Sequence, residues 1–122
     1  MLSLPLPVRI FLCTQPADMR RSFDGLAQMV REFLGADPLS GHLFVFRSKR
    51  GDRLKLLYWD SDGLAIWYKR LEEGTFRFPA APAEGGGIEV RAADLAMLLD
   101  GVDLESVQRR KRYRRPAAAS TR

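Results

Sequence analysis

Residues 42–78 have the sequence HLFVFRSKRGDRLKLLYWDSDGLAIWYKRLEEGTFRF, in which apolar runs alternate with short polar turns. The β-branched and aromatic residues of each run favour strands, and the glycine-containing segments between them favour tight turns. An Asp-Gly pair between two apolar runs, here Asp62-Gly63, is among the strongest local signals for a hairpin. The stretch therefore predicts an antiparallel meander with strands at 42–47, 53–60, 64–70 and 75–78.

Both faces of the two central strands are largely apolar. Along 53–60 and 64–70, the odd-numbered and the even-numbered residues, which point to opposite faces, are both mostly aliphatic or aromatic. A sheet with one solvated face would alternate more cleanly. Two short helices that cover both faces would explain the pattern. Alternatively, one face binds another subunit, since Trp and Tyr are frequent anchors of interfaces. The residues expected in such a partner interface are Trp59 and Trp67.

The flanking segments predict one more strand on each side of the meander and two helices. Residues 8–14 and 88–90 are rich in strand-forming types. Apolar residues at helical spacing run from Phe23 to Leu34, where Gly35 ends the pattern. A shorter helix is predicted at 91–100.

These elements predict an α+β fold, an antiparallel β-meander with one main amphipathic helix, a short helix near the C-terminal end and a basic tail. A single domain is expected over residues 1–104. Residues 105–122 are expected to form the tail, which is polar enough to be disordered.

The charge of the chain is concentrated near its C-terminal end. The 122 residues carry a net charge of +5, yet residues 1–108 hold 13 basic and 15 acidic side chains. A basic arm with an aromatic ring is typical of nucleic-acid binding, because cations hold phosphates while a base stacks on the ring. A solvated tail that only aids solubility is the alternative. The predicted DNA contacts of the tail are Arg109, Arg110, Lys111, Arg112, Tyr113, Arg114 and Arg115.

A second basic cluster surrounds the first turn of the meander, where five of nine residues are basic and Asp52 is the single acid. A two-stranded ribbon can enter a major groove or lie along phosphates. Basic side chains also protect exposed strand edges from aggregation, which is the alternative here. The predicted DNA contacts of this hairpin are Arg47, Lys49, Arg50, Arg53 and Lys55.

The sequence offers little for catalysis. Its one cysteine, Cys13, excludes an intramolecular disulfide, and no acid or nucleophile is suggested beside its one histidine, His42. Residues 60–63 begin like a calcium loop but lack the later ligands. We predict no catalytic residue, no metal site and no cofactor. Because we find neither an apolar run of about 18 residues nor a signal peptide, we expect a cytoplasmic protein without membrane contacts.

Several blocks of the sequence, in order and at similar spacing, resemble one protein family. DMRRSFDGL at residues 18–26 is similar to the leading signature of that family. GHLFVFR at 41–47 and KLLYWD at 55–60 resemble its central block, and LAMLLDGVD at 95–103 resembles its closing block. The family comprises the TnpB-type accessory proteins, the second open reading frame products of the IS66 bacterial insertion sequences. The resemblance covers about residues 5–104.

The resemblance implies a role in transposition beside a larger, separate transposase that cuts and joins DNA. It implies no catalytic residue in this chain. We therefore expect as partners the DNA of the element ends, the transposase of the same element and, as a further candidate, a second copy of the chain. A pure protein-protein assembly module of the transposition complex, without direct DNA binding, is the alternative.

Overall fold

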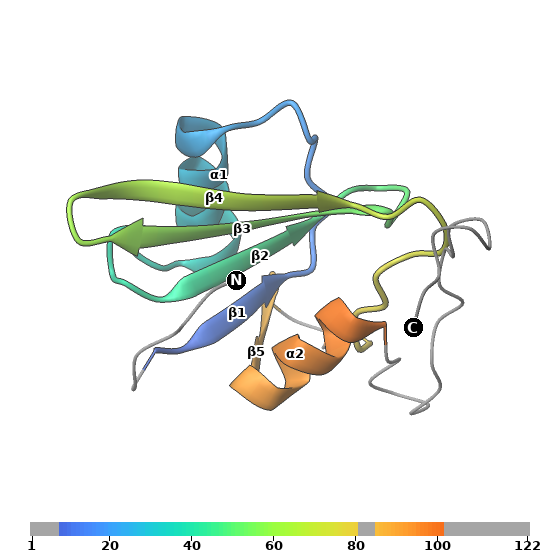
Figure 1. The fold of residues 1–122 in the computed structure, drawn as a ribbon. Helices are drawn as coiled ribbons and strands as arrows, with labels where there is room; N and C mark the ends of the chain where they lie inside the picture. Colours follow the sequence, from blue (N-terminus) through green and yellow to red (C-terminus); the bar gives the residue numbers. More distant parts are fainter. Residues whose placement is uncertain (1–7, 81–84, 102–122) are drawn as a thin grey trace.

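The computed structural model describes residues 8–80 and 85–101 of the chain. Figure 1 shows one sheet with a helix on each side. The strands lie in the order β4-β3-β2-β1-β5, and consecutive strands β2, β3 and β4 pair antiparallel as the predicted meander. The α+β fold class is thereby confirmed. The elements are β1 (Ile10–Cys13), α1 (Phe23–Met29), η1 (Val30–Leu34), β2 (Leu43–Arg47), β3 (Arg53–Asp60), β4 (Gly63–Arg70), β5 (Gly87–Val90) and α2 (Ala92–Asp100).

The sheet is mixed, because β1 joins the meander in parallel orientation. Ile10 of β1 lies opposite Leu43 of β2, and β5 pairs antiparallel with the other edge of β1. Parallel neighbours need a crossover connection, and the segment containing α1 and η1 provides it. The meander extends only over β2, β3 and β4, and the two remaining strands widen the sheet beyond it.

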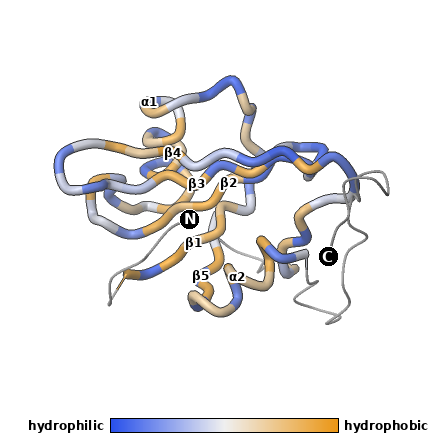
Figure 2. Tube along the Cα trace, viewed as in Figure 1, coloured by the Kyte–Doolittle hydropathy of each residue, from blue (hydrophilic) through white to orange (hydrophobic). Residues whose placement is uncertain are grey.

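The two faces of the sheet carry separate hydrophobic cores. On one face, Leu26 and Val30 of the first helical segment pack with Leu57 of β3 in a buried cluster. On the other, Leu95 and Leu98 of α2 belong to a buried cluster with strand residues such as Leu56. Figure 2 shows hydrophobic residues along the central strands. Helices therefore cover both faces of the central strands, which explains why the core positions on both faces are apolar.

The predicted fourth strand of the meander, Thr75–Phe78, is wrong. These residues form no strand, and Phe76 is instead fully buried in the cluster that contains α2. The backbone N–H of Phe76 donates to the carbonyl of Gly51 at 2.8 Å, and that of Leu71 donates to the carbonyl of Asp52 at 2.8 Å. The segment after β4 thus hydrogen-bonds to the β2–β3 turn.

The first helix ends in a wider turn than the periodicity predicts. After Met29 the chain continues as the π-helical η1, and the N–H of Ala36 donates to the carbonyl of Val30 at 3.3 Å. Gly35 closes it with φ of +59°, the left-handed conformation in which glycine carries no Cβ penalty. The predicted boundaries at Phe23 and Leu34 are confirmed, while the internal change of helix type carries no sequence signal that we recognise.

Candidate nucleic-acid interface

The tip of the β2–β3 hairpin presents two exposed cations, Lys49 and Arg50. The turn is closed by hydrogen bonds, since the N–H of Gly51 donates to the carbonyl of Ser48 and that of Ser48 donates to the carbonyl of Arg53, both at 3.0 Å. Within the described part of the chain, neither Lys49 nor Arg50 forms an ion pair. Both side chains are therefore accessible to a large anionic ligand.

Arg47, at the base of the same hairpin, has a structural role instead. Its Nη1 donates to the carbonyl of Phe76 at 3.0 Å, and its guanidinium carbon lies 4.2 Å from the centre of the Phe78 ring. Burial, with a smaller contribution from the charge of Arg77, lowers the pKa of Arg47 from its ordinary value. These contacts hold the segment after β4 against the sheet. We therefore remove Arg47 from the predicted DNA contacts.

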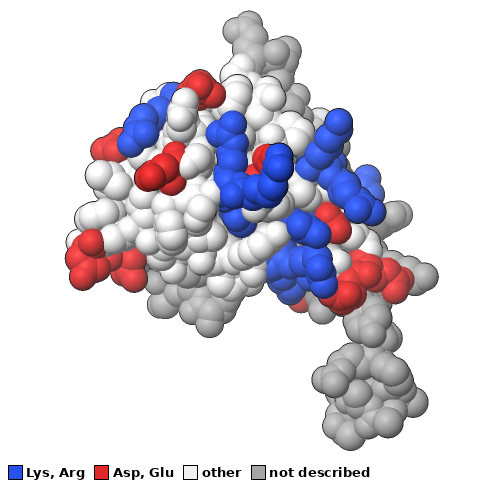
Figure 3. Space-filling model, turned by 90° about the horizontal axis from the view of Figure 1, so that it is seen from above, with Lys and Arg blue, Asp and Glu red and all other residues white. Residues whose placement is uncertain are grey.

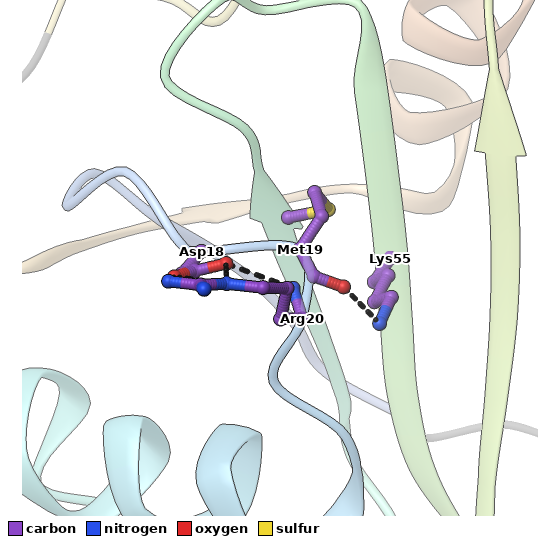
Figure 4. A network of polar contacts seen from close by, with 4 residues as sticks. All are labelled: Asp18, Met19, Arg20 and Lys55. Carbon is purple, nitrogen blue, oxygen red and sulfur yellow. Dashed lines mark hydrogen bonds and ion pairs between the residues drawn. The ribbon is translucent and has the colours of Figure 1, made fainter.

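Lys55 is also unsuited to its predicted role as a DNA contact, because it is one of the few buried polar residues. Its Nζ donates to the carbonyl of Met19 at 2.9 Å and to that of Arg21 at 2.7 Å. Figure 4 shows the first of these bonds next to the pair formed by Asp18 and Arg20. Burial lowers the pKa of Lys55, although the charge of Asp18 opposes this effect. The ammonium anchors the segment before α1 and does not face solvent as a phosphate contact would.

The segment anchored by Lys55 contributes two exposed arginines that sequence reasoning did not select. Arg20 binds Asp18 through its backbone N–H at 2.9 Å and through Nη2 at 2.7 Å, and its side chain stays 91% exposed. These hydrogen bonds, more than charge alone, lower the pKa of Asp18 to about 2. Arg21 donates from Nη1 to the carbonyl of Gly25 at 3.2 Å. Both guanidinium groups are thus oriented by short-range bonds at the start of α1.

The β3–β4 register brings further charged and aromatic groups to the same face of the sheet. Arg53 lies opposite Arg70, and Lys55 lies opposite Tyr68, so these four side chains share the face on which α1 packs. Arg53, Tyr68 and Arg70 line a shallow pocket of about 380 Å³ together with Glu72. Glu72 pairs with Arg70 at 3.4 Å. An exposed ring therefore lies next to two guanidinium groups, of which Arg70 is paired with a carboxylate.

These groups define a surface that we call the basic face. Figure 3 shows Lys and Arg side chains gathered over the middle and one side of this view of the molecule. The sequence alone missed Tyr68, Arg70 and the two arginines before α1. The predicted hairpin pairs residue 53 with Arg70 and residue 55 with Tyr68, so its register would have identified these two. The basic face consists of Arg20, Arg21, Lys49, Arg50, Arg53, Tyr68 and Arg70.

The two tryptophans predicted as one partner interface lie on opposite faces of the sheet. Trp59 lies opposite Leu64, on the face with α1, whereas Trp67 lies opposite Leu56, on the face with α2. A single aromatic surface that contains both is therefore wrong. Both are half-buried, and Trp67 packs against the α2 cluster. A partner contact by either one stays a prediction.

The remaining predictions concern the tail, metal binding and membrane contacts. The tail residues Arg109–Arg115 lie outside the described residues. Over 8–80 and 85–101, no cluster of three or more His, Cys, Asp or Glu side chains is placed to hold a metal ion. In the same residues, no helix is long and apolar enough to cross a membrane.

Comparison with known proteins gives one family and two relatives. The family model described as "IS66 Orf2 like protein" matches residues 8–109. The chain is 42% identical over 109 residues to the uncharacterized protein y4jC of Sinorhizobium fredii, covering 89% of this chain and 91% of that protein. It is 44% identical over 96 residues to the uncharacterized protein y4hO of the same organism, covering 79% and 82% of the two chains. No solved structure matches the chain.

Proposed function

The chain belongs to the family of IS66 Orf2-like proteins, and from this premise we propose that it is a non-catalytic accessory of transposition that binds DNA through the basic face. The family membership supports an accessory role in the movement of a bacterial insertion sequence. It does not by itself supply a molecular action. The proposed DNA contact rests on the surface chemistry of this chain.

The observation that carries the proposal is the convergence of cations from three separate segments onto one surface. The segment before α1, the hairpin tip and the adjacent ends of β3 and β4 each contribute exposed or half-exposed Arg or Lys side chains. Arg53 and Arg70 lie directly opposite each other, and the single carboxylate of Glu72, which pairs with Arg70, leaves one of these two positive charges for a further anion. Phosphate groups of DNA provide such an anion, and they dominate the affinity of DNA-binding proteins.

The test is DNA binding across a salt series, with a terminal repeat of the element and a random duplex of equal length as probes. Each lost phosphate contact reduces the slope of log K against log salt by about 1. We expect the double variant Arg53→Gln with Arg70→Gln to reduce that slope by about 2. Arg31→Gln, at an exposed arginine on η1, is the matched control and should leave the slope unchanged.

The contribution of the tail is separated by a chain that ends at Val107. If all six basic residues of 109–115 contacted phosphate, their removal would reduce the slope by about 5. A preference for the terminal repeat that survives this truncation would indicate base recognition by the domain itself. Absence of binding by the full-length protein at low salt would contradict the proposal.

A second candidate function, assembly with the transposase without DNA binding, is favoured by exposed aromatic side chains on the first helical segment. Phe23 is 44% exposed and Phe33 is 38% exposed. Aromatic residues of this kind are frequent anchors of protein interfaces. Under this alternative the transposase is retained in a pull-down, the basic-face variants have no effect, and Phe23→Ala or Phe33→Ala weakens retention.

A further inference from the structure

We infer that the basic face takes single-stranded DNA, with one base stacked on the exposed ring of Tyr68. This inference rests on the proposed function and deepens it, because it names the form of DNA that the face binds.

Tyr68 is an aromatic residue that the fold leaves open although a core lies on the same face. It is 47% exposed, whereas Ile66, two residues earlier on the same face of β4, packs against the α1 cluster. The Nζ of Lys55 lies 4.7 Å from the ring centre, and two backbone carbonyls hold that nitrogen in place. Lys55 thereby covers one side of the ring and restricts its position. The remaining exposed surface is available for stacking.

Two cations for the phosphates of the same strand lie at one end of this ring, where Arg53 and Arg70 pair across the β3–β4 ladder. Residues two apart on a strand lie about 7 Å apart on one face, so Arg70 is one such step from Tyr68. Arg53 is the same step from Lys55 and faces Arg70 across the ladder. A chain with one base on Tyr68 therefore has guanidinium groups within reach of its neighbouring phosphate. Aromatic rings beside basic grooves are the general means of holding single strands.

The preference for single-stranded DNA follows from the geometry of stacking. A base in a duplex has both faces covered by its neighbours, so a protein ring can stack on it only after it has been unstacked. A base in a single strand presents a free face to Tyr68. The pocket of about 380 Å³ formed by Arg53, Tyr68, Arg70 and Glu72 is shallow and open, as such a ligand requires.

The experiment measures binding of the full-length protein to an oligo-dT strand and to a duplex of the same length by fluorescence anisotropy. Tyr68→Ala should weaken single-strand binding by about 5-fold to 100-fold, the range expected for one lost base–aromatic stack. Duplex binding should change by less than about 2-fold, because phosphate contacts supply its affinity. Tyr68→Phe keeps the ring and should bind like the unmodified protein. Leu39→Ala, which removes an exposed apolar side chain outside the basic face, is the control.

A cross-linking measurement on the unmodified protein gives a readout that does not depend on how well a variant folds. An oligo-dT strand that carries 5-iododeoxyuridine should cross-link on irradiation to the peptide that contains Tyr68. Cross-links only to other peptides, or equal losses on strand and duplex for Tyr68→Ala, would overturn the inference and leave the proposed function intact. If the protein bound neither probe at low salt, the proposed function would fail as well.

Discussion

Lys55 and Tyr68 lie opposite each other across the β3–β4 ladder, with the ammonium nitrogen 4.7 Å from the centre of the ring. The same nitrogen donates to the carbonyls of Met19 and Arg21. One buried cation therefore connects an edge strand, its neighbour and the segment that leads into α1. The position of the exposed arginines before α1 depends on this connection.

We expect Lys55→Met to lower the free energy of unfolding by about 1–3 kcal/mol, the cost of leaving a buried polar group without its hydrogen-bond partner. The methionine keeps most of the side-chain volume but leaves two carbonyls without their donor. Urea denaturation measures the effect. Lys69→Met is the matched control, because Lys69 is exposed on the adjacent strand, and it should cost less than about 0.5 kcal/mol. Equal losses for the two variants would contradict the anchoring role of Lys55.

Arg47 and Arg50 should show opposite behaviour although both belong to the same hairpin. Arg47→Met removes the bond to the Phe76 carbonyl and the contact with Phe78, so it should cost about 1–3 kcal/mol of stability. It should leave the salt dependence of DNA binding unchanged. Arg50→Met should leave stability within about 0.5 kcal/mol and reduce the salt slope by about 1. Urea denaturation and a salt series on both variants test this, and a reduced slope for Arg47→Met would restore it as a DNA contact.

The meander could be predicted from sequence because its signals are local. Apolar runs bounded by Gly51 and by Asp62-Gly63 specify strands that pair with their neighbours in the chain. The failed strand at Thr75–Phe78 has the same composition, but a buried Phe76 and a hydrogen bond to the carbonyl of Gly51 outweigh strand propensity there. The parallel pairing of β1 depends on a crossover, which short-range patterns do not encode.

The candidate site was only partly predictable for a related reason. Charge density along the chain identified Lys49, Arg50 and Arg53, which the fold leaves exposed or half-exposed. Charge density cannot show that Lys55 points toward carbonyls before α1, since those residues are more than thirty positions away. It also cannot join Arg70 to Arg53, which the register of β3 and β4 alone accomplishes.

Gly86 is predicted to be intolerant of any side chain. A Cβ at this position would overlap the backbone carbonyl oxygen of Phe33 at the end of η1, and backbone cannot move aside as a flexible side chain can. We expect Gly86→Ala to cost about 1–3 kcal/mol, the usual penalty of overpacking. Gly63→Ala is the control, because a Cβ there meets nothing within 4 Å. Thermal unfolding compares the two, and equal midpoints would show that η1 and the start of β5 are not in close contact.

The pair formed by Asp18 and Arg20 predicts a loss of stability in acid. The folded pKa of Asp18, about 2, lies below its ordinary value of 3.8, so the unfolded chain binds a proton more readily. The stabilising contribution of Asp18 is therefore present above about pH 4 and is lost as the pH falls toward 2. Unfolding midpoints measured across this range should fall less steeply for Asp18→Asn than for the unmodified protein. Arg20→Gln should flatten the curve in the same way, and an unchanged curve in both variants would contradict the pairing.

Trp59 and Trp67 provide a test of which sheet face would contact the transposase, the partner of the second candidate function. Because they lie on opposite faces, a partner bound to one face contacts only one of them. Trp67 packs against the α2 cluster, so Trp67→Ala should reduce the unfolding midpoint more than Trp59→Ala, through the cavity it leaves. In a transposase pull-down at a temperature where both variants are folded, we expect at most one of them to lose the partner. Trp67→Phe, which retains an aromatic ring in the core, separates a lost contact from a weakened fold. Loss of the transposase with both alanine variants, at full folding, would instead indicate a partner that wraps around the β4 edge.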